Sequence, residues 1–287
     1  MMPQKILVLG ATGMLGNAVF RYFAKHTGHD VVGSVRSLNS AKSLPTDVQS
    51  RIVAGGSVED PDMLARLLDR VLPTMVVNCV GLVKQLEDGQ DPLSAIPINS
   101  VLPHRLARLC ALAGARLVHL STDCVFSGKK GMYTEADIPD AYDVYGRTKL
   151  LGEIDYPHAI TLRTSIIGHE LSGANSLIGW FLSQQGKVRG FNKAIFSGLP
   201  TVEIARIIDE YVIPRSDLSG LYHVSAEPID KATLLRLVAQ AYGKEIEIEN
   251  DEALIIDRSL DSSRFRQATG FEPKPWPELV DLMCKFF

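Results

Sequence analysis

The sequence has little of what marks disulfide-rich, zinc-binding and membrane-spanning proteins. Its 4 cysteines, Cys79, Cys110, Cys124 and Cys284, are widely scattered and form no CxxC pair. That spacing argues against a disulfide framework and against a zinc site, so we expect no metal. No apolar run approaches the ~18 residues of a transmembrane helix. The run KILVLG is too short for a signal peptide and leads into glycines. These absences predict a soluble cytoplasmic protein.

The sequence also lacks a charge excess of either sign. The formal net charge is −3 and the sequence pI is about 6.2, which leaves no broad basic surface for a nucleic acid. Hydrophobic residues make up 46% of the 287 residues, enough for a sizeable core. At roughly 100–200 residues per domain, this length predicts one large domain or two smaller ones.

The first two-thirds of the chain alternate strand-like and helix-like segments. Ile6–Leu9 is a continuous apolar run, as in a buried parallel strand, and Leu15–Lys25 then has helical spacing. Further strands are predicted at Val31–Val35, Arg51–Ala54, Met75–Gly81, Arg116–Ser121 and Ala159–Arg163, and helices at 59–71, Val101–Ala113 and 142–153. This alternation predicts an α/β fold with a doubly wound parallel sheet, whose ligands bind beyond the carboxyl ends of the strands.

The pattern changes after about residue 168. The segment GHELSGANS is typical of a loop, and residues 187–200 are short and mixed. Helices are predicted at Leu177–Ser183, Thr201–Val212 and 230–242, and strands at Gly220–Val224 and, exposed, at 245–249. We therefore predict a Rossmann domain from residues 1–168 plus about 201–226. A smaller substrate-binding lobe would comprise about 169–200 plus 227–287.

A glycine-rich turn, GATGMLG, follows the first strand and opens the first helix. Gly10, Gly13 and Gly16 let the backbone turn tightly and approach a pyrophosphate, while the helix N-terminus presents free N–H groups to it. The spacing is GxxGxxG instead of GxGxxG, and three glycines in such a turn can also serve packing alone. Because the turn follows the first strand, we favour a dinucleotide site.

The end of the second strand bears on the choice of dinucleotide. It reads VVGSVRS, with Arg36 about 20 residues after the last glycine of the turn and no adjacent acid. An acidic residue at this position favours NAD, and a basic one favours NADP. A guanidinium can pair with the 2′-phosphate, although a solvated surface arginine is the alternative. We therefore predict NADP, with NAD as a second possibility.

Tyr145 and Lys149, in VYGRTKLLGE, are four residues apart, so on a helix they share one face. An ammonium beside a phenol lowers the phenol pKa from its usual value of about 10. Such a phenol can protonate a carbonyl oxygen while hydride reaches the carbon. A YxxxK pair also occurs by chance in many helices. Here Ser121, Thr122 and Asp123 end the preceding strand, where a hydroxyl can hold the same substrate oxygen.

GATGMLG, STDCVFSG, YGRTKLLGE and the triplet Arg163-Thr164-Ser165 together resemble the extended short-chain dehydrogenase/reductase family, most closely its dTDP-4-dehydrorhamnose reductase branch. The resemblance covers residues 5 to about 226. It implies that Thr122 orients the substrate carbonyl, Tyr145 is the acid, and Lys149 holds the nicotinamide ribose. Cofactor contacts are then expected at Gly10, Thr12, Gly13, Met14, Leu15, Gly16, Arg36, Cys79, Val80, Gly81, Asn99, Lys149 and Thr164. Substrate contacts are expected at Lys84, Asp123, Cys124, Val125, Tyr145 and Arg163.

Two departures from the family pattern bear on the substrate. Cys124 stands where many relatives have an aromatic residue, and NCVGLVKQLEDGQDP differs from the usual alanine-rich segment. The function expected from the resemblance is NADPH-dependent reduction of a nucleotide-activated 4-keto-6-deoxy sugar, in a protein that forms a homodimer. A nucleotide-sugar epimerase or dehydratase, and a binding subunit without turnover, stay open as alternatives.

Several other side chains have two interpretations. Lys84 either meets a substrate phosphate or is solvated, and Cys124 is more typical of packing than of a nucleophile. His119 and His223 lie in apolar strands, as core histidines do. The acids Glu135, Asp137, Asp140 and Asp143 are more typical of a solvated loop and a helix N-terminus than of a metal site.

Overall fold

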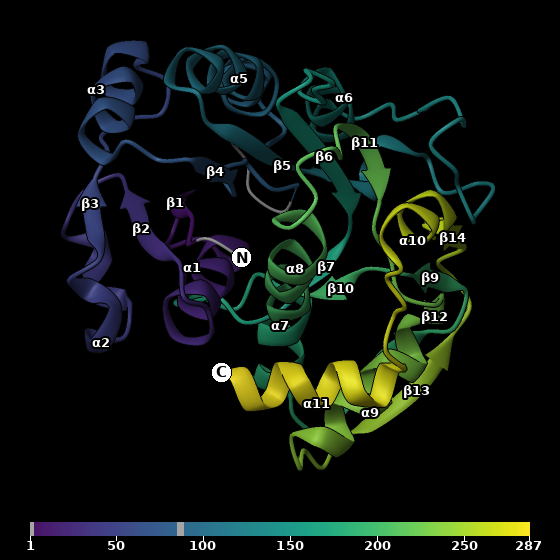
Figure 1. Ribbon diagram of the computed structural model, residues 1–287. Helices are drawn as coiled ribbons and strands as arrows, with labels where there is room; N and C mark the ends of the chain where they lie inside the picture. The colour runs from purple at the N-terminus through teal and green to yellow at the C-terminus, as the bar shows by residue number, and fades with distance from the viewer. Residues whose placement is uncertain (1–2, 85–88) are drawn as a thin grey trace.

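The computed structural model describes residues 3–84 and 89–287 (Figure 1). Its centre is a seven-stranded sheet with the order β11-β6-β5-β4-β1-β2-β3. These strands are β1 (Lys5–Leu9), β2 (Asp30–Val35), β3 (Ile52–Ala54), β4 (Met75–Asn78), β5 (Arg116–Thr122), β6 (Ala159–Thr164) and β11 (Gly220–His223). Every neighbouring pair is parallel. The predicted doubly wound sheet is confirmed, and its switch point lies between β1 and β4.

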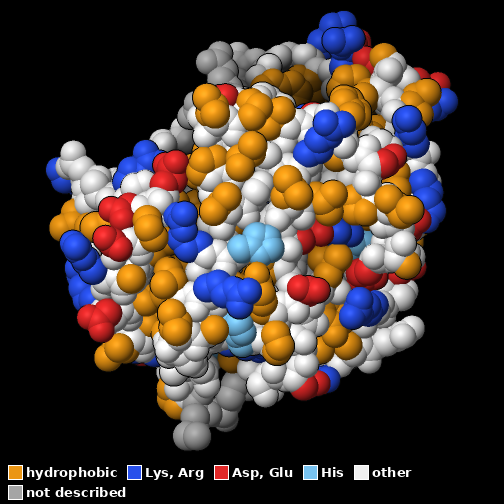
Figure 2. Space-filling model, turned by 90° about the horizontal axis from the view of Figure 1, so that it is seen from above, with side chains coloured by type: hydrophobic (Ala, Val, Ile, Leu, Met, Phe, Trp, Pro, Cys, Tyr) orange, Lys and Arg blue, Asp and Glu red, His pale blue; other side chains and the backbone are white. Residues whose placement is uncertain are grey.

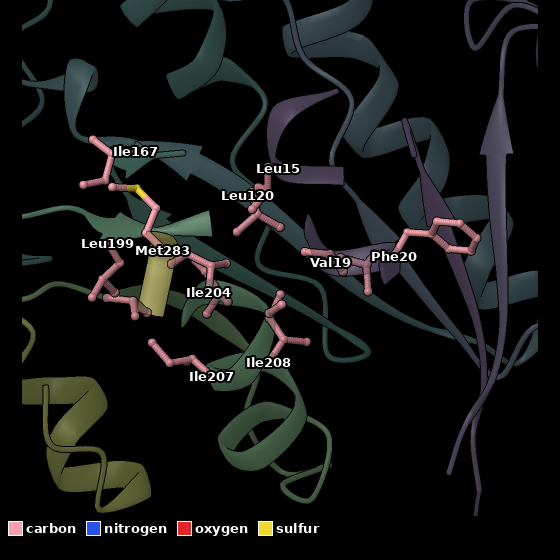
Figure 3. Packing of buried hydrophobic residues seen from close by; sticks show 14 of the residues in the cluster. Leu15, Val19, Phe20, Leu120, Ile167, Leu199, Ile204, Ile207, Ile208 and Met283 are labelled. Atoms are coloured by element: carbon pink, nitrogen blue, oxygen red, sulfur yellow. The ribbon is translucent and has the colours of Figure 1, made fainter. Parts of the chain in front are cut away.

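Helices cover both faces of this sheet, because successive residues of a strand point to opposite sides. Ile6 and Val8 of β1 join a core with α1 (Met14–His26) and α8 (Thr201–Ile207). Leu7 and Leu9 join a second core with α3 (Pro61–Val71) and α5 (Leu102–Ala113). Figure 3 shows the first core, where side chains of α1 and α8 face one another. Burial on both faces explains the continuous apolar run of β1.

Several elements begin or end away from the predicted residues. The strand expected at Met75–Gly81 ends at Asn78, and the helix expected at 142–153 is α6 (Val144–Leu151). Before α5 lie α4 (Pro92–Ala95) and a π-helical turn, Ile96–Val101, which carries Asn99. The helix expected at Thr201–Val212 likewise ends in a π-helical turn, Ile208–Val212. Such turns are frequent at functional sites.

The rest of the chain builds small sheets beside the main one. β7 (Ile166–Ile167) pairs with β10 (Leu199–Pro200), β8 (Lys187–Phe191) with β13 (Glu247–Asp251), and β9 (Ala194–Phe196) lies between β12 (Ile229–Asp230) and β14 (Ile256–Asp257). The remaining helices are α2 (Thr46–Gln49), α7 (Leu177–Ser183), α9 (Lys231–Ala241), α10 (Ser263–Thr269) and α11 (Trp276–Phe286). The strand predicted at 245–249 is β13, shifted by two residues. The sequence patterns did not predict α10 and α11.

The last helix connects this smaller part to the main sheet. Leu279 and Met283 of α11 belong to the same core as Ile6 and Val8. Figure 3 shows Met283 close to Ile204 of α8. The division into two domains stays a prediction. Within the described residues, no helix has the length and apolar character needed to cross a bilayer.

Candidate active site

The glycine-rich turn between β1 and α1 has the conformation that only glycines allow. Gly10 has a φ of +80°, and a Cβ added there would lie 3.4 Å from the carbonyl carbon of Cys79. A Cβ added to Gly16 would lie 2.1 Å from the Gly10 carbonyl oxygen, so α1 packs directly against the turn. Gly13 is exposed, and α1 has no side-chain cap. The N–H groups of its first turn are therefore suited to a phosphate.

The other residues expected at this turn differ in exposure. Thr12 and Met14 are partly exposed beside Gly13, whereas the Leu15 side chain lies in the core. Only the backbone of Leu15 is therefore available to a dinucleotide. Arg36 follows β2 immediately, and its side chain is exposed. β2 is the neighbour of β1, so the end of β2 and the turn lie at the same edge of the sheet.

A second wall of the site follows β4. Asn78 accepts a hydrogen bond from the Val80 N–H (3.1 Å) and also pairs with Nδ1 of the buried His119 (3.1 Å). Asn99 accepts from the Leu82 N–H (2.9 Å) and donates to the Leu82 carbonyl (3.3 Å). A Cβ added to Gly81 would lie 3.8 Å from the Lys149 Nζ. Asn78 and Asn99 thus hold the backbone of the Cys79–Leu82 wall next to Lys149.

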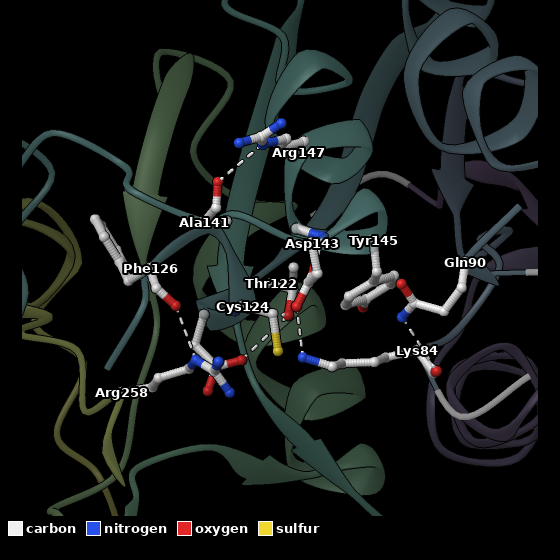
Figure 4. A network of polar contacts seen from close by, with 12 residues as sticks. Lys84, Gln90, Thr122, Cys124, Phe126, Ala141, Asp143, Tyr145, Arg147 and Arg258 are labelled. Atoms are coloured by element: carbon white, nitrogen blue, oxygen red, sulfur yellow. Dashed lines mark hydrogen bonds and ion pairs between the residues drawn. The ribbon is translucent and has the colours of Figure 1, made fainter. Parts of the chain in front are cut away.

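Thr122, Tyr145 and Lys149 meet beyond the carboxyl end of β5. Thr122 is the last residue of β5, and its Oγ1 accepts from the Cys124 N–H (3.1 Å). Lys149 is buried, with 6% of its surface exposed, and its Nζ donates to the Leu120 carbonyl (2.7 Å). Figure 4 shows Thr122, Cys124 and Tyr145 gathered in one place. The structure therefore brings together the three residues expected to be catalytic.

The direction of the Tyr145 pKa shift differs from the expectation. Burial raises the pKa of its phenol, and the Thr122 hydroxyl offsets this only in part. Burial also lowers the pKa of Lys149 to about 8, while the Glu153 charge raises it. We expected Lys149 to lower the pKa of Tyr145, but burial dominates. Tyr145 is protonated at neutral pH, as an unshifted phenol also is, and the raised pKa makes it a weaker acid in the absence of ligands.

Two features of α6 fix the position of Tyr145. Asp143 caps the helix, accepting from the Gly146 N–H at 2.7 Å, and also forms an ion pair with Lys84 at 2.5 Å. A Cβ added to Gly146 would lie 2.3 Å from the Cys124 carbonyl oxygen. Glycine after Tyr145 therefore lets α6 pack against the segment that follows β5.

Some of the expected substrate residues lie near Tyr145, and the others have interior side chains. Lys84, Asp123 and Cys124 lie near Tyr145, and Figure 4 shows the Lys84–Asp143 pair beside them. Burial raises the pKa of the Cys124 thiol to about 12, which agrees with a packing role. Burial also raises the pKa of Asp123. Residues 85–88, which belong to the atypical segment after β4, lie outside the described residues.

Three expected contacts, Val125, Arg163 and Thr164, have interior side chains, and their roles stay predictions. Val125 is fully buried in a cluster with Phe126 and Tyr133, so it offers no surface to a substrate. Arg163 has 2% of its surface exposed and makes a bidentate ion pair with Glu153 (2.8 and 2.5 Å). Thr164, expected at the cofactor, is 2% exposed and donates to the Ser165 carbonyl. Arg163 is thus bonded to Glu153, and its expected substrate role stays a prediction.

Sequence reasoning assigned no role to Glu153, Lys231 and Arg258. Arg258 follows β14, donates to the Phe126 carbonyl (2.8 Å), and its charge opposes the burial that raises the pKa of Asp123. Lys231 begins α9, and burial lowers its pKa against the influence of Asp123. Figure 4 shows Arg258 beside Cys124. No sequence motif contains Lys231 or Arg258. They lie near Asp123 only because distant segments of the chain pack together there.

The acids weighed as metal ligands make separate contacts. Asp137 pairs with Lys130, Asp140 accepts from Ser127, and Glu135 accepts from the His223 N–H. In the part of the chain that the structure describes, no three His, Cys, Asp or Glu side chains are grouped as metal ligands would be. The glycine turn and the wall at Gly81, in contrast, fit a dinucleotide that extends from α1 toward Lys149.

Comparison with known proteins identifies relatives of this chain. The family description "RmlD substrate binding domain" matches residues 4–285. The chain is 32% identical over 178 residues to the "Probable low-salt glycan biosynthesis reductase Agl14" of Haloferax volcanii, covering 60% of this chain and 57% of that protein. It is 31% identical over 150 residues to the methionine adenosyltransferase 2 subunit beta of Mus musculus, covering 52% and 42%. The chain thus spans about half the length of these curated relatives.

Solved structures share the fold. The dTDP-4-dehydrorhamnose reductase of Bacillus anthracis, in complex with NADP, superposes with a TM-score of 0.78 at 18% identity, covering 98% of this chain and 99% of that one. The dTDP-glucose 4,6-dehydratase of the same organism, in complex with NAD, gives a TM-score of 0.78 at 16% identity, covering 98% and 95%. Relatives of this fold therefore bind NADP or NAD. The match over residues 4–285 shows that this chain belongs to the RmlD substrate binding domain family.

Proposed function

We propose that this protein is an NADPH-dependent reductase of a nucleotide-activated 4-keto-6-deoxy sugar. The observation that supports this most is the placement of a protonated Tyr145 beside Thr122, with Lys149 next to the Gly81 wall. These groups lie at the edge of the sheet where the glycine turn is suited to a pyrophosphate.

In this proposal each residue has one task. NADPH supplies a hydride to the keto carbon. The Thr122 hydroxyl orients the keto oxygen, and the Tyr145 phenol donates its proton to that oxygen as negative charge develops there. The Lys149 ammonium binds the nicotinamide ribose from its position beside Gly81. Asn78 and Asn99 keep the Cys79–Leu82 backbone at the cofactor.

A panel of nucleotide-linked 4-keto sugars tests the function. Each sugar is mixed with the protein and NADPH, absorbance records cofactor oxidation, and NMR gives the configuration of the product. We expect one NADPH oxidised per keto sugar reduced for at least one member. Product formation without net NADPH consumption would instead indicate an epimerase or dehydratase, which recycles its cofactor.

A binding subunit without turnover is the second candidate. The similarity to a protein named as a subunit beta of methionine adenosyltransferase 2 favours it. Tight NADPH binding with no oxidation by any sugar of the panel would support this candidate and contradict the reductase. The presence of Thr122, Tyr145 and Lys149 in one place supports the reductase, because binding alone does not require an acid.

The proposal includes a preference for NADPH that depends on Arg36. Replacing Arg36 by alanine is expected to weaken NADPH binding about 10–100-fold, since hydrogen bonds to charged groups contribute about 1.5–3 kcal/mol. NADH binding should change little, because NADH lacks the 2′-phosphate. Fluorescence titration with both cofactors measures this. Arg70→Ala, on the exposed side of α3, is the matched control. Equal losses for NADPH and NADH would exclude a contact with the 2′-phosphate.

We further propose that the protein forms a homodimer through α5 and α6. Figure 2 shows apolar side chains on this face, interspersed with basic side chains and histidines. Val101, Leu112 and Leu151 are exposed there, and a hollow of about 450 Å³ lies between His104, Arg108, Leu151 and Tyr156. Exposed apolar patches often mark protein–protein contacts.

A further inference from the structure

Glu153 holds its carboxylate in a buried network that the proposed mechanism does not use. Its side chain is 11% exposed. Oε1 accepts from the Ser121 hydroxyl at 2.6 Å and from Arg163 Nε at 2.8 Å, and Oε2 accepts from Arg163 Nη2 at 2.5 Å. Ser121 lies on β5 and Arg163 on β6, where the two residues are direct partners. The carboxylate is therefore fixed by two strands of the main sheet.

Hydrogen bonds through His223 also hold Arg163, the positive partner in the network. Arg163 Nη1 lies 2.8 Å from His223 Nε2, and His223 Nδ1 lies 2.9 Å from the Tyr133 carbonyl oxygen. A carbonyl only accepts, so Nδ1 carries the proton and Nε2 accepts from Arg163. Burial, with the Arg163 charge, lowers the pKa of His223 to about 4. The network thus contains one negative charge, on Glu153, and one positive charge, on Arg163.

The cysteine, tyrosine and histidine side chains around Lys149 are neutral around pH 7. Burial raises the pKa of Cys79 to about 12 and also raises that of Tyr145. Burial lowers the pKa of His119 far below its usual value, so its imidazole is uncharged. Leu120 and Asn99 offer only dipoles. Glu153 is the charged group that raises the pKa of Lys149 most, and the nearby positive charge is that of Arg163, which is bonded to the same carboxylate.

We propose that Glu153 is a positioning residue that keeps the buried Lys149 amine in its ammonium form, with Ser121 and Arg163 holding the carboxylate in place. This inference rests on the proposed function for its consequence, because the ammonium is the form that would bind the nicotinamide ribose. Lys149 Nζ is bonded to the Leu120 carbonyl (2.7 Å), and Glu153 Oε1 to the hydroxyl of the next residue, Ser121 (2.6 Å), so consecutive residues of β5 hold the two groups close to each other. The Glu153 charge favours the protonated amine, whereas burial disfavours it.

The sign of the effect follows from these two influences. The pKa of Lys149 is lowered to about 8, so half of the amine is already neutral at pH 8. Without the Glu153 charge, burial acts alone and the pKa falls further. An opposite charge at close range shifts a pKa by about 1–3 units. As the pH rises, a variant without the Glu153 charge should therefore lose the ammonium at a lower pH than the unchanged protein does. Cofactor binding should weaken over the same pH range.

The experiment titrates Lys149 directly in the full chain. Protein with [13Cε]lysine is followed by NMR from pH 6 to pH 10, and Lys149→Arg assigns the signal. In Glu153→Gln, which keeps oxygen and nitrogen atoms for Ser121 and Arg163, we expect the Lys149 midpoint to fall by at least about one unit. At pH 8, NADPH should then bind about fivefold more weakly, with no change at pH 6.

The matched control is Glu135→Gln. Glu135 is a neighbouring carboxylate that accepts from the backbone N–H of His223 and contacts neither Arg163 nor Ser121 among the hydrogen bonds of the described residues. Its loss should leave the Lys149 midpoint unchanged. If Glu153→Gln does not fold because Arg163 lacks a counter-charge, Glu153→Gln/Arg163→Met removes both charges and should still show the lower midpoint.

An unchanged Lys149 midpoint in a folded Glu153 variant would overturn the inference, whatever the activity. Because the NMR titration requires neither cofactor nor sugar, it is independent of the proposed function. A lower midpoint in a protein that reduces no keto sugar would leave the inference standing and contradict the reductase.

Discussion

Replacing Tyr145 by phenylalanine is expected to lower turnover about 10²–10⁴-fold, the usual contribution of a general acid. The change removes only the phenol oxygen. Tyr145 carries its proton throughout the neutral range, and the negative charge that develops on the keto oxygen as hydride arrives draws that proton from the phenol. The substrate's Michaelis constant should change much less, since Thr122 still orients the same oxygen.

Steady-state rates with the best sugar of the panel, together with NADPH titrations, measure this effect. Tyr142→Phe is the matched control, because Tyr142 lies three residues away and is 74% exposed. It should retain full turnover. If Tyr145→Phe bound NADPH normally and retained more than about a tenth of the turnover, another group would have to be the acid.

The central sheet and the turn were predictable because they depend on local patterns. A buried strand needs a continuous apolar run, and a tight approach to β4 needs glycine at position 10. Tyr145 and Lys149 were predictable as a pair because helical spacing alone puts them on one face. Each of these inferences uses residues within a few positions of one another.

The role of Arg163 was not predictable, because it depends on strand register and on a partner from another element. In the β5–β6 register, Ser121 lies opposite Arg163 and Thr122 opposite Thr164. Since neighbouring residues of a strand point to opposite faces, one position decides whether a side chain faces Glu153. The sequence showed that Arg163 ends a strand but did not show which face it occupies.

The cations of the C-terminal part were missed for a different reason. Lys231 begins α9, and Arg258 follows the two-residue strand β14. Strands this short have no periodicity to detect. The link of Arg258 to the Phe126 carbonyl spans 132 positions in the chain. Only tertiary packing brings these residues to Asp123.

The buried ion pair of Arg163 leads to a second large effect, on stability. Arg163→Met is expected to lower the free energy of unfolding by about 3–5 kcal/mol, the usual cost of leaving one partner of a buried ion pair alone. Glu153 would keep its negative charge with only the Ser121 hydroxyl to satisfy it. The loss is a large part of the roughly 5–15 kcal/mol that keeps a typical domain folded.

Urea unfolding, followed by circular dichroism, measures this cost. Arg163→Met/Glu153→Gln should recover much of the loss, because it removes the uncompensated charge together with its former partner. Lys285→Met, which breaks the exposed pair with Asp281, is the control and should leave the unfolding midpoint nearly unchanged. A substrate-binding arginine would give the opposite result, a raised Michaelis constant with full stability. Since Arg163 is 2% exposed and bonded to Glu153 and His223, we expect the loss of stability.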